Sequence, residues 1–136
     1  KVTLFSQHRH VVRHVFLDGP LKLDADADPT WEGYSSGRWE GDTLVVEVTG
    51  FNGQTWLDRA GNYASAAAKV TERYTPLSPN HIQYEATIED PSVYTEAWSI
   101  RMPLYRIVDD NYRLLEFKCE PFAEEKLYGH LRKPAE

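Results

Sequence analysis

Strict alternation of apolar and polar residues runs through the middle of the chain and predicts β-strands. The clearest case is Thr43–Thr49, in which three aliphatic residues fall on one face of the strand. Arg38–Glu40 precedes it across a Gly41-Asp42 turn, so the two segments are predicted to form a β-hairpin. Earlier segments can then pair with the first strand of this hairpin, and later segments with the second.

The same alternation predicts further strands on both sides of the hairpin. They are Lys1–Gln7, His8–Leu17, Lys69–Thr75, His81–Glu89, Thr95–Val108 and Tyr112–Glu120. Pro103 lies inside one of them and indicates an edge position or a bulge. Breaker-rich Leu21–Ser36 is predicted to be a surface loop, and Gly50–Ala67 a long connection with one helical turn at Ala64–Ala68. The composition of Pro121–Arg132 predicts a short C-terminal helix.

Seven or eight strands joined mostly by short turns predict an all-β fold built as an antiparallel meander. A meander of this length must curl, so we expect a lipocalin-like barrel, with a two-sheet β-sandwich as the alternative. The 136 residues correspond to a single domain, and 41% hydrophobic residues are enough for one core.

Composition narrows the classes of partner. The formal net charge is −6 and there is no strongly basic stripe, which argues against binding to a nucleic-acid backbone. No apolar run reaches the length of a membrane span. Cys119 is the one cysteine and cannot form an internal disulfide. Because the chain begins at Lys1 rather than Met, we expect a mature or trimmed form whose targeting segment is not shown. The expected location is periplasmic or secreted.

Polar and aromatic residues gather in the long connection after the central strand, where a barrel commonly carries its ligand contacts. The candidate ligand-binding residues are Trp39, Asn52, Trp56, Arg59 and Asn62. Asp58 and Arg73 are the candidate catalytic residues, Asp58 as a base or hydrogen-bond acceptor. The alternative is structural: Asp58 caps a turn, Trp56 plugs the barrel end, and Asn52 occupies a tight bend.

Three histidines form a second candidate site. His8, His10 and His14 share one face if the strand is continuous, and a His-x-His pair is a recurrent way to place two imidazoles on one metal ion. The alternative is a solvated strand face that binds nothing. A divalent metal is therefore the one cofactor that the sequence suggests, and no organic cofactor is expected because nucleotide and phosphate motifs are lacking.

Charged residues recur on successive predicted strands, at Glu47, Arg73, Glu85, Arg101 and Glu116. Facing solvent, they form cross-strand ion pairs; facing the lumen, they make a polar pocket. Alternation alone does not decide between the two faces, and the solvent face is favoured.

Two stretches carry a resemblance to a known family: GRWEGDTLVVEVTGFNGQTWLDRAGN and VTERYTPLSPNHIQYEATIEDPSVYTEAW. They resemble an uncharacterised, often exported bacterial protein family with no established activity. The likeness covers Gly37 to about Trp98. Its members often carry a His-Ser-Glu-Ala-Leu pattern where this chain has Ala64–Ala68, so a catalytic role for that loop is weakened.

Three functions remain open from the sequence. The first is binding of an apolar or aromatic small molecule, or acid–base catalysis, in a β-barrel cavity. The second is a metal-dependent enzyme with a His-x-His site, and the third is a non-catalytic carbohydrate-binding or assembly module. The chain is expected to act as a monomer or a homodimer.

Overall fold

The computed structural model describes residues 1–7, 11–17, 19, 26–58, 60–115 and 122–131. The described residues form nine strands, one α-helix and one 3₁₀ helix. They are β1 (Val2–Phe5), β2 (Val12–Phe16), β3 (Tyr34–Glu40), β4 (Thr43–Thr49), β5 (Thr55–Trp56), β6 (Tyr63–Ala64), β7 (Lys69–Ser78), β8 (His81–Glu89), β9 (Trp98–Tyr105), α1 (Ala123–Tyr128) and η2 (Gly129–Leu131).

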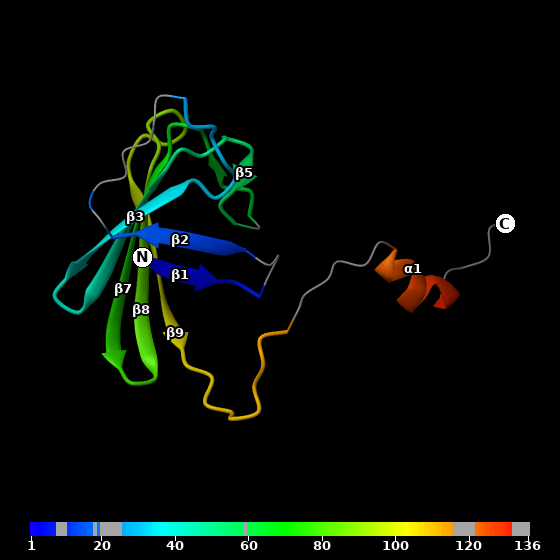
Figure 1. Ribbon diagram of the computed structural model, residues 1–136. Coiled ribbons are helices and arrows are strands. Elements are labelled where there is room, and N and C mark those ends of the chain that lie inside the picture. The colour runs from blue at the N-terminus through cyan, green and yellow to red at the C-terminus, as the bar shows by residue number, and fades with distance from the viewer. Residues whose placement is uncertain (8–10, 18, 20–25, 59, 116–121, 132–136) are drawn as a thin grey trace.

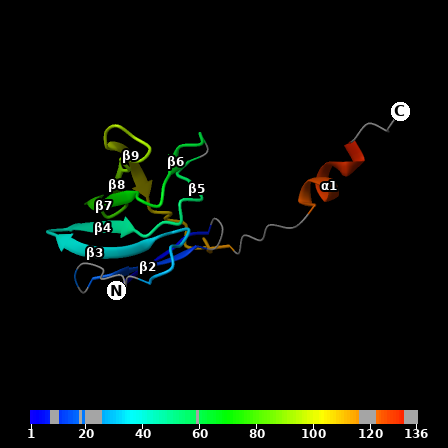
Figure 2. The ribbon, with the colours of Figure 1, turned by 90° about the horizontal axis from the view of Figure 1, so that it is seen from above.

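Seven strands form one sheet in the order β1-β2-β3-β4-β7-β8-β9, and β5 and β6 pair separately. The large sheet is curled into a half-barrel, with β1 and β2 folded in front of β7, β8 and β9 (Figure 1). Seen from above, the β5–β6 pair lies at one end of the curl, and α1 lies away from the sheet (Figure 2). The curl creates a concave side that faces inward and a convex side that faces outward.

The predicted β-rich fold and the short C-terminal helix are confirmed, but two features of the predicted topology differ. Neighbouring strands are antiparallel except for β2 and β3, which are parallel. The sheet is also not closed, since β1 and β9 are its two edges. Closure into a lipocalin-like barrel stays a prediction.

Several strand boundaries differ from the predicted ones, and the differences at β3 and at the predicted last strand are the most informative. β3 begins at Tyr34, four residues before the predicted start, because Ser35 and Ser36 pair with Val48 and Glu47 of β4. Serines give no apolar alternation, so only the tertiary pairing reveals this part of the strand. Over residues 112–115 of the predicted last strand there is no strand, and 116–120 lie outside the described residues. The edge position predicted from Pro103 is confirmed, because β9 is an edge strand.

The β3–β4 hairpin forms as predicted, with Glu40 paired to Thr43 across a two-residue turn. Gly41 adopts φ +59° at the first turn position, which is the geometry of a type II′ turn. Val45 of β4 faces the convex side and is nevertheless fully buried. Its register neighbours Arg38 and Arg73 both pair with Glu40 at 2.9 Å, so we infer that their aliphatic stems cover it.

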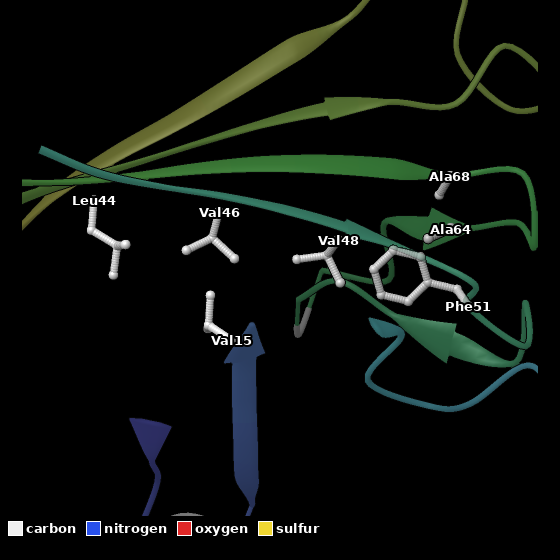
Figure 3. Close-up of a cluster of buried hydrophobic side chains, with 7 residues drawn as sticks. All are labelled: Val15, Leu44, Val46, Val48, Phe51, Ala64 and Ala68. Atoms are coloured by element: carbon white, nitrogen blue, oxygen red, sulfur yellow. The ribbon is translucent and has the colours of Figure 1, made fainter. Parts of the chain in front are cut away.

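The hydrophobic core lies on the concave side, between β4 and the strands folded over it. Val15 of β2 faces Leu44 and Val46, and Phe51 extends the cluster toward the end of β4 (Figure 3). The full buried cluster is Val15, Leu44, Val46, Val48, Phe51, Ala64 and Ala68. The aliphatic residues that were predicted to share one face of β4 therefore form its inward face, and the core holds β2 opposite the middle of the sheet.

The connection between β4 and β7 is fixed at one end of the half-barrel. Buried Asp90, just after β8, accepts hydrogen bonds from the backbone N–H of Ser65 at 2.6 Å and from its hydroxyl at 2.8 Å. The Tyr94 hydroxyl donates to the carbonyl of Tyr63 at 2.8 Å. The predicted helical turn at Ala64–Ala68 is absent, because β6 ends at Ala64 and a turn follows.

Candidate functional site

A cavity of about 470 Å³ opens on the concave side of the sheet. Three tryptophans, Trp31, Trp56 and Trp98, contribute to its lining together with aliphatic residues of β4, β7, β8 and β9. Its volume falls within the range of about 300–1,000 Å³ that small-molecule sites occupy. A second space of about 370 Å³ lies on the β1 side and shares Arg13 and Glu32 with the first.

The polar centre of the cavity is a buried carboxylate, Glu72 of β7, which is 5% exposed. Arg13 of β2 donates from Nη2 to Glu72 Oε2 at 2.6 Å. On the other carboxylate oxygen, Oε1, Glu72 accepts hydrogen bonds from the hydroxyls of Tyr84 at 2.8 Å and Tyr74 at 3.2 Å. β3 and β4 separate β2 from β7 in the sheet, so the curl brings these partners together across its interior.

The surroundings fix the protonation of the tyrosines and the arginine. Burial, reinforced by the neighbouring Glu72 charge, raises the pKa of Tyr74 to about 12 and raises that of Tyr84 as well. Burial opposes the charge of Arg13, but attraction and hydrogen bonding to Glu72 outweigh it and raise the pKa of Arg13. Arg13 is therefore a cation and both tyrosines are neutral hydrogen-bond donors at physiological pH.

Trp98 adds an unpaired polar atom to the wall. Its indole nitrogen Nε1 is buried and has no hydrogen-bond acceptor within the described residues. The Trp98 ring stacks edge-on against Tyr94, with 5.5 Å between the ring centroids. A buried donor without an acceptor costs free energy of about 1–3 kcal/mol, so this wall has an unmet hydrogen bond.

Two of the predicted loop residues lie at the cavity, and the loop uses its other polar groups internally. Trp56, 71% exposed, and Asp58 both line the cavity. Asp58 accepts hydrogen bonds from the backbone of Ala60 at 2.8 Å and from the side chain of Asn62. The bond from Asn62 is the largest cause that lowers the pKa of Asp58. Asp58 therefore caps this turn as an ionised group.

The remaining predicted site residues lie elsewhere or outside the described residues. Asn52 accepts a hydrogen bond from the Gln54 backbone at 3.0 Å and so stabilises a bend. Trp39 is 58% exposed near the hairpin turn and does not line the cavity. Arg73 lies on the convex side with Glu40, so the structure does not bring Arg73 and Asp58 together. Arg59 lies outside the described residues.

The recurring charged residues face the convex side. Glu47 forms an ion pair with Arg38, and Arg73 forms one with Glu40. Glu85 pairs with Arg101 across β8 and β9. These positions are opposite to the inward-facing residues of the same strands, so they are the outer ion pairs that the sequence analysis favoured. Glu116 lies outside the described residues.

Of the three histidines, only His14 belongs to the described part of the chain. It faces outward on β2, and its Nδ1 lies 3.2 Å from the hydroxyl of Thr3. Among the described residues no group of three or more His, Cys, Asp or Glu side chains is placed to hold a metal ion. His8 and His10 lie outside those residues, so the metal site stays a prediction.

Sequence reasoning missed Arg13, Glu72, Tyr84 and Trp98, which line the cavity. One signal for Glu72 was present, because it alternates with Val70 and Tyr74 on the inward face of its strand. A charged residue at an inward position is costly unless it is paired, which marks it as a candidate. Its partner Arg13 is 59 residues away along the chain, and no local pattern connects the two.

Comparison with known proteins assigns neither a family nor a function to this chain. No family model, curated protein or solved structure matches the chain. The family resemblance drawn from the two sequence stretches is thus not tested by this comparison. Within the described residues, no helix has both the length and the apolar character needed to cross a membrane.

Proposed function

We propose that this protein binds an apolar or aromatic small molecule in the cavity on the concave side of its sheet. The observation that carries the proposal is the joint position of the aromatic walls and the buried Arg13–Glu72–Tyr84 cluster within one cavity of about 470 Å³. Apolar walls with a few convergent polar groups are typical of small-molecule sites.

Binding is favoured over acid–base catalysis by Asp58. Both Asp58 oxygens accept hydrogen bonds from the loop, and its lowered pKa makes it a weak base. The proposal keeps two expectations from the sequence: lipocalin-like closure of the sheet, and a periplasmic or secreted location. Closure would add a wall to the cavity between β1 and β9.

The proposal is tested with the neutral apolar dye N-phenyl-1-naphthylamine, whose fluorescence rises in an apolar site. We expect saturable binding at one site per chain. Ile100 lines the cavity and Ser99 faces the convex side beside Thr87, so Ile100→Trp fills the cavity while Ser99→Trp leaves it unchanged. Ile100→Trp should weaken dye binding at least about tenfold, in line with the strict steric limits of packed sites.

Two results would contradict this function. One is the absence of saturable dye binding to the unmodified protein. The other is an equal loss of dye affinity in Ile100→Trp and Ser99→Trp, which would show that the dye does not occupy the concave cavity. Circular dichroism of each variant provides the check that the sheet is intact.

A further inference from the structure

The charges of the residues that line the cavity predict the sign of the charge on its ligand. Among the described lining residues, three are carboxylates, Glu32, Asp58 and Glu72, and one is a cation, Arg13. Arg13 and Glu72 form an ion pair at 2.6 Å and so offset each other. Glu32 and Asp58 therefore leave the lining with a formal charge of −2. The net charge of −6 on the whole chain reinforces this field.

The aromatic residues of the lining suit a cation as well. Trp31 and Trp56 are 56% and 71% exposed, so their indole faces remain accessible at the cavity. Tyr84 of β8 and Trp98 of β9 also line the cavity and are half-buried. The face of an aromatic ring carries negative potential and attracts organic cations by about 0.5–2 kcal/mol per contact. Both the carboxylates and the rings thus favour the same class of ligand.

We propose that the ligand of this cavity is an aromatic organic cation, such as an arylalkyl ammonium compound. This inference rests on the proposed binding function and specifies it further. The apolar part of the ligand would contact the aliphatic residues of β7, β8 and β9, and the ammonium group would lie among the tryptophans and the carboxylates. An anion of the same size would meet Glu32 and Asp58 without a compensating free cation in the described lining.

Three probes of similar shape separate charge from apolar contact. They are benzyltrimethylammonium as the cation, neopentylbenzene as its neutral isostere and phenylmethanesulfonate as the anion. Each competes against N-phenyl-1-naphthylamine for the cavity. We expect the cation to displace the dye at a concentration at least about tenfold lower than the anion, as expected for two like charges near the ligand.

Variants test the origin of that preference. Glu32 is exposed, so Glu32→Gln should preserve the structure while removing one lining charge. It should weaken the cation about threefold or more and leave the neutral isostere unchanged, because only the charged probe senses the carboxylate. Glu85→Gln is the matched control, since Glu85 pairs with Arg101 on the convex side.

The outcomes are separable. A cation that binds no better than the anion, or a Glu32→Gln effect equal for cation and neutral probe, overturns the charge inference while the binding function stands. Failure of the dye to bind the unmodified protein overturns both. A Glu85→Gln effect as large as that of Glu32→Gln would place the cation on the outer face and also overturn the inference.

Discussion

At the scale of single residues, Glu72 is the group that links the two sides of the half-barrel. Its carboxylate pairs with Arg13 from β2 and accepts hydrogen bonds from Tyr74 and Tyr84 of β7 and β8. A buried carboxylate persists only when such partners compensate for the lost hydration. The cluster therefore fixes where β2 stands over β7, and with it the shape of the cavity.

Removal of the Glu72 charge should cost stability. Glu72→Gln leaves Arg13, whose side chain is 18% exposed, without its counter-charge. We expect a loss of about 3 kcal/mol in the free energy of unfolding, the lower end of the range for a broken buried pair. Glu85→Gln on the convex side, where the pair with Arg101 is more exposed, should cost less than about 1 kcal/mol. Urea denaturation of both variants measures the difference.

A double replacement checks the cause of that loss. Arg13→Met with Glu72→Leu removes both charges and should regain most of the stability, because no buried charge is left unpaired. Equal destabilisation by Glu72→Gln and Glu85→Gln would contradict the interior role of Glu72. The same holds if the double variant is less stable than Glu72→Gln alone.

At the scale of elements, the contact between β2 and β3 depends on Gly37. A Cβ at this position would stand 2.6 Å from Val15 Cγ1 and 3.1 Å from Leu17 Cδ2. Real side-chain carbons do not approach so closely, so β2 would have to move outward. Gly37 thus allows β2 to lie tightly on the sheet and to direct Arg13 into its interior.

Gly37→Ala is expected to destabilise the protein by about 1–3 kcal/mol, the usual cost of overpacking. The size of the loss should depend on Val15, so the effects of Gly37→Ala and Val15→Ala should not add in a double-mutant cycle. Gly41→Ala is the control for the double-mutant cycle, because a Cβ there meets nothing within 4 Å and only the φ of +59° is strained. Its effect should therefore add to that of Val15→Ala. Additive effects of the Gly37 and Val15 changes would contradict the close contact of β2 and β3.

Local pattern predicted the elements better than their arrangement. The alternation in Thr43–Thr49 identified the strand and the aliphatic residues that share one face, because the pleat alone decides which side chains share a face. Which face is inward follows only from the core. The parallel β2–β3 pair and the early start of β3 at Tyr34 follow from tertiary pairing that no local pattern encodes. For the candidate site, Trp56 and Asp58 could be selected from the composition of their loop and line the cavity, whereas Arg13 and Glu72 meet only through the curl.

At the scale of the whole molecule, the curl of one open sheet creates both the core and the cavity. The core fills the concave side near β2 and β4, and the cavity occupies the part between the β4–β6 connection and β8–β9. The convex side carries ion pairs that are exposed to solvent. The molecule thus separates an outer charged face from an inner face that combines aromatic walls with one buried carboxylate, which is the basis of the proposed binding function.

The indole N–H signals of the four tryptophans report directly on whether a ligand occupies the cavity on the concave side. In a ¹H–¹⁵N NMR titration with N-phenyl-1-naphthylamine, the signals of Trp31, Trp56 and Trp98, which line the cavity, should shift together and saturate. The signal of Trp39, which does not line it, should stay in place. Single Trp→Phe variants assign the four signals. Shifts confined to Trp39, or no saturable shift in the three others, would contradict a ligand site on the concave side.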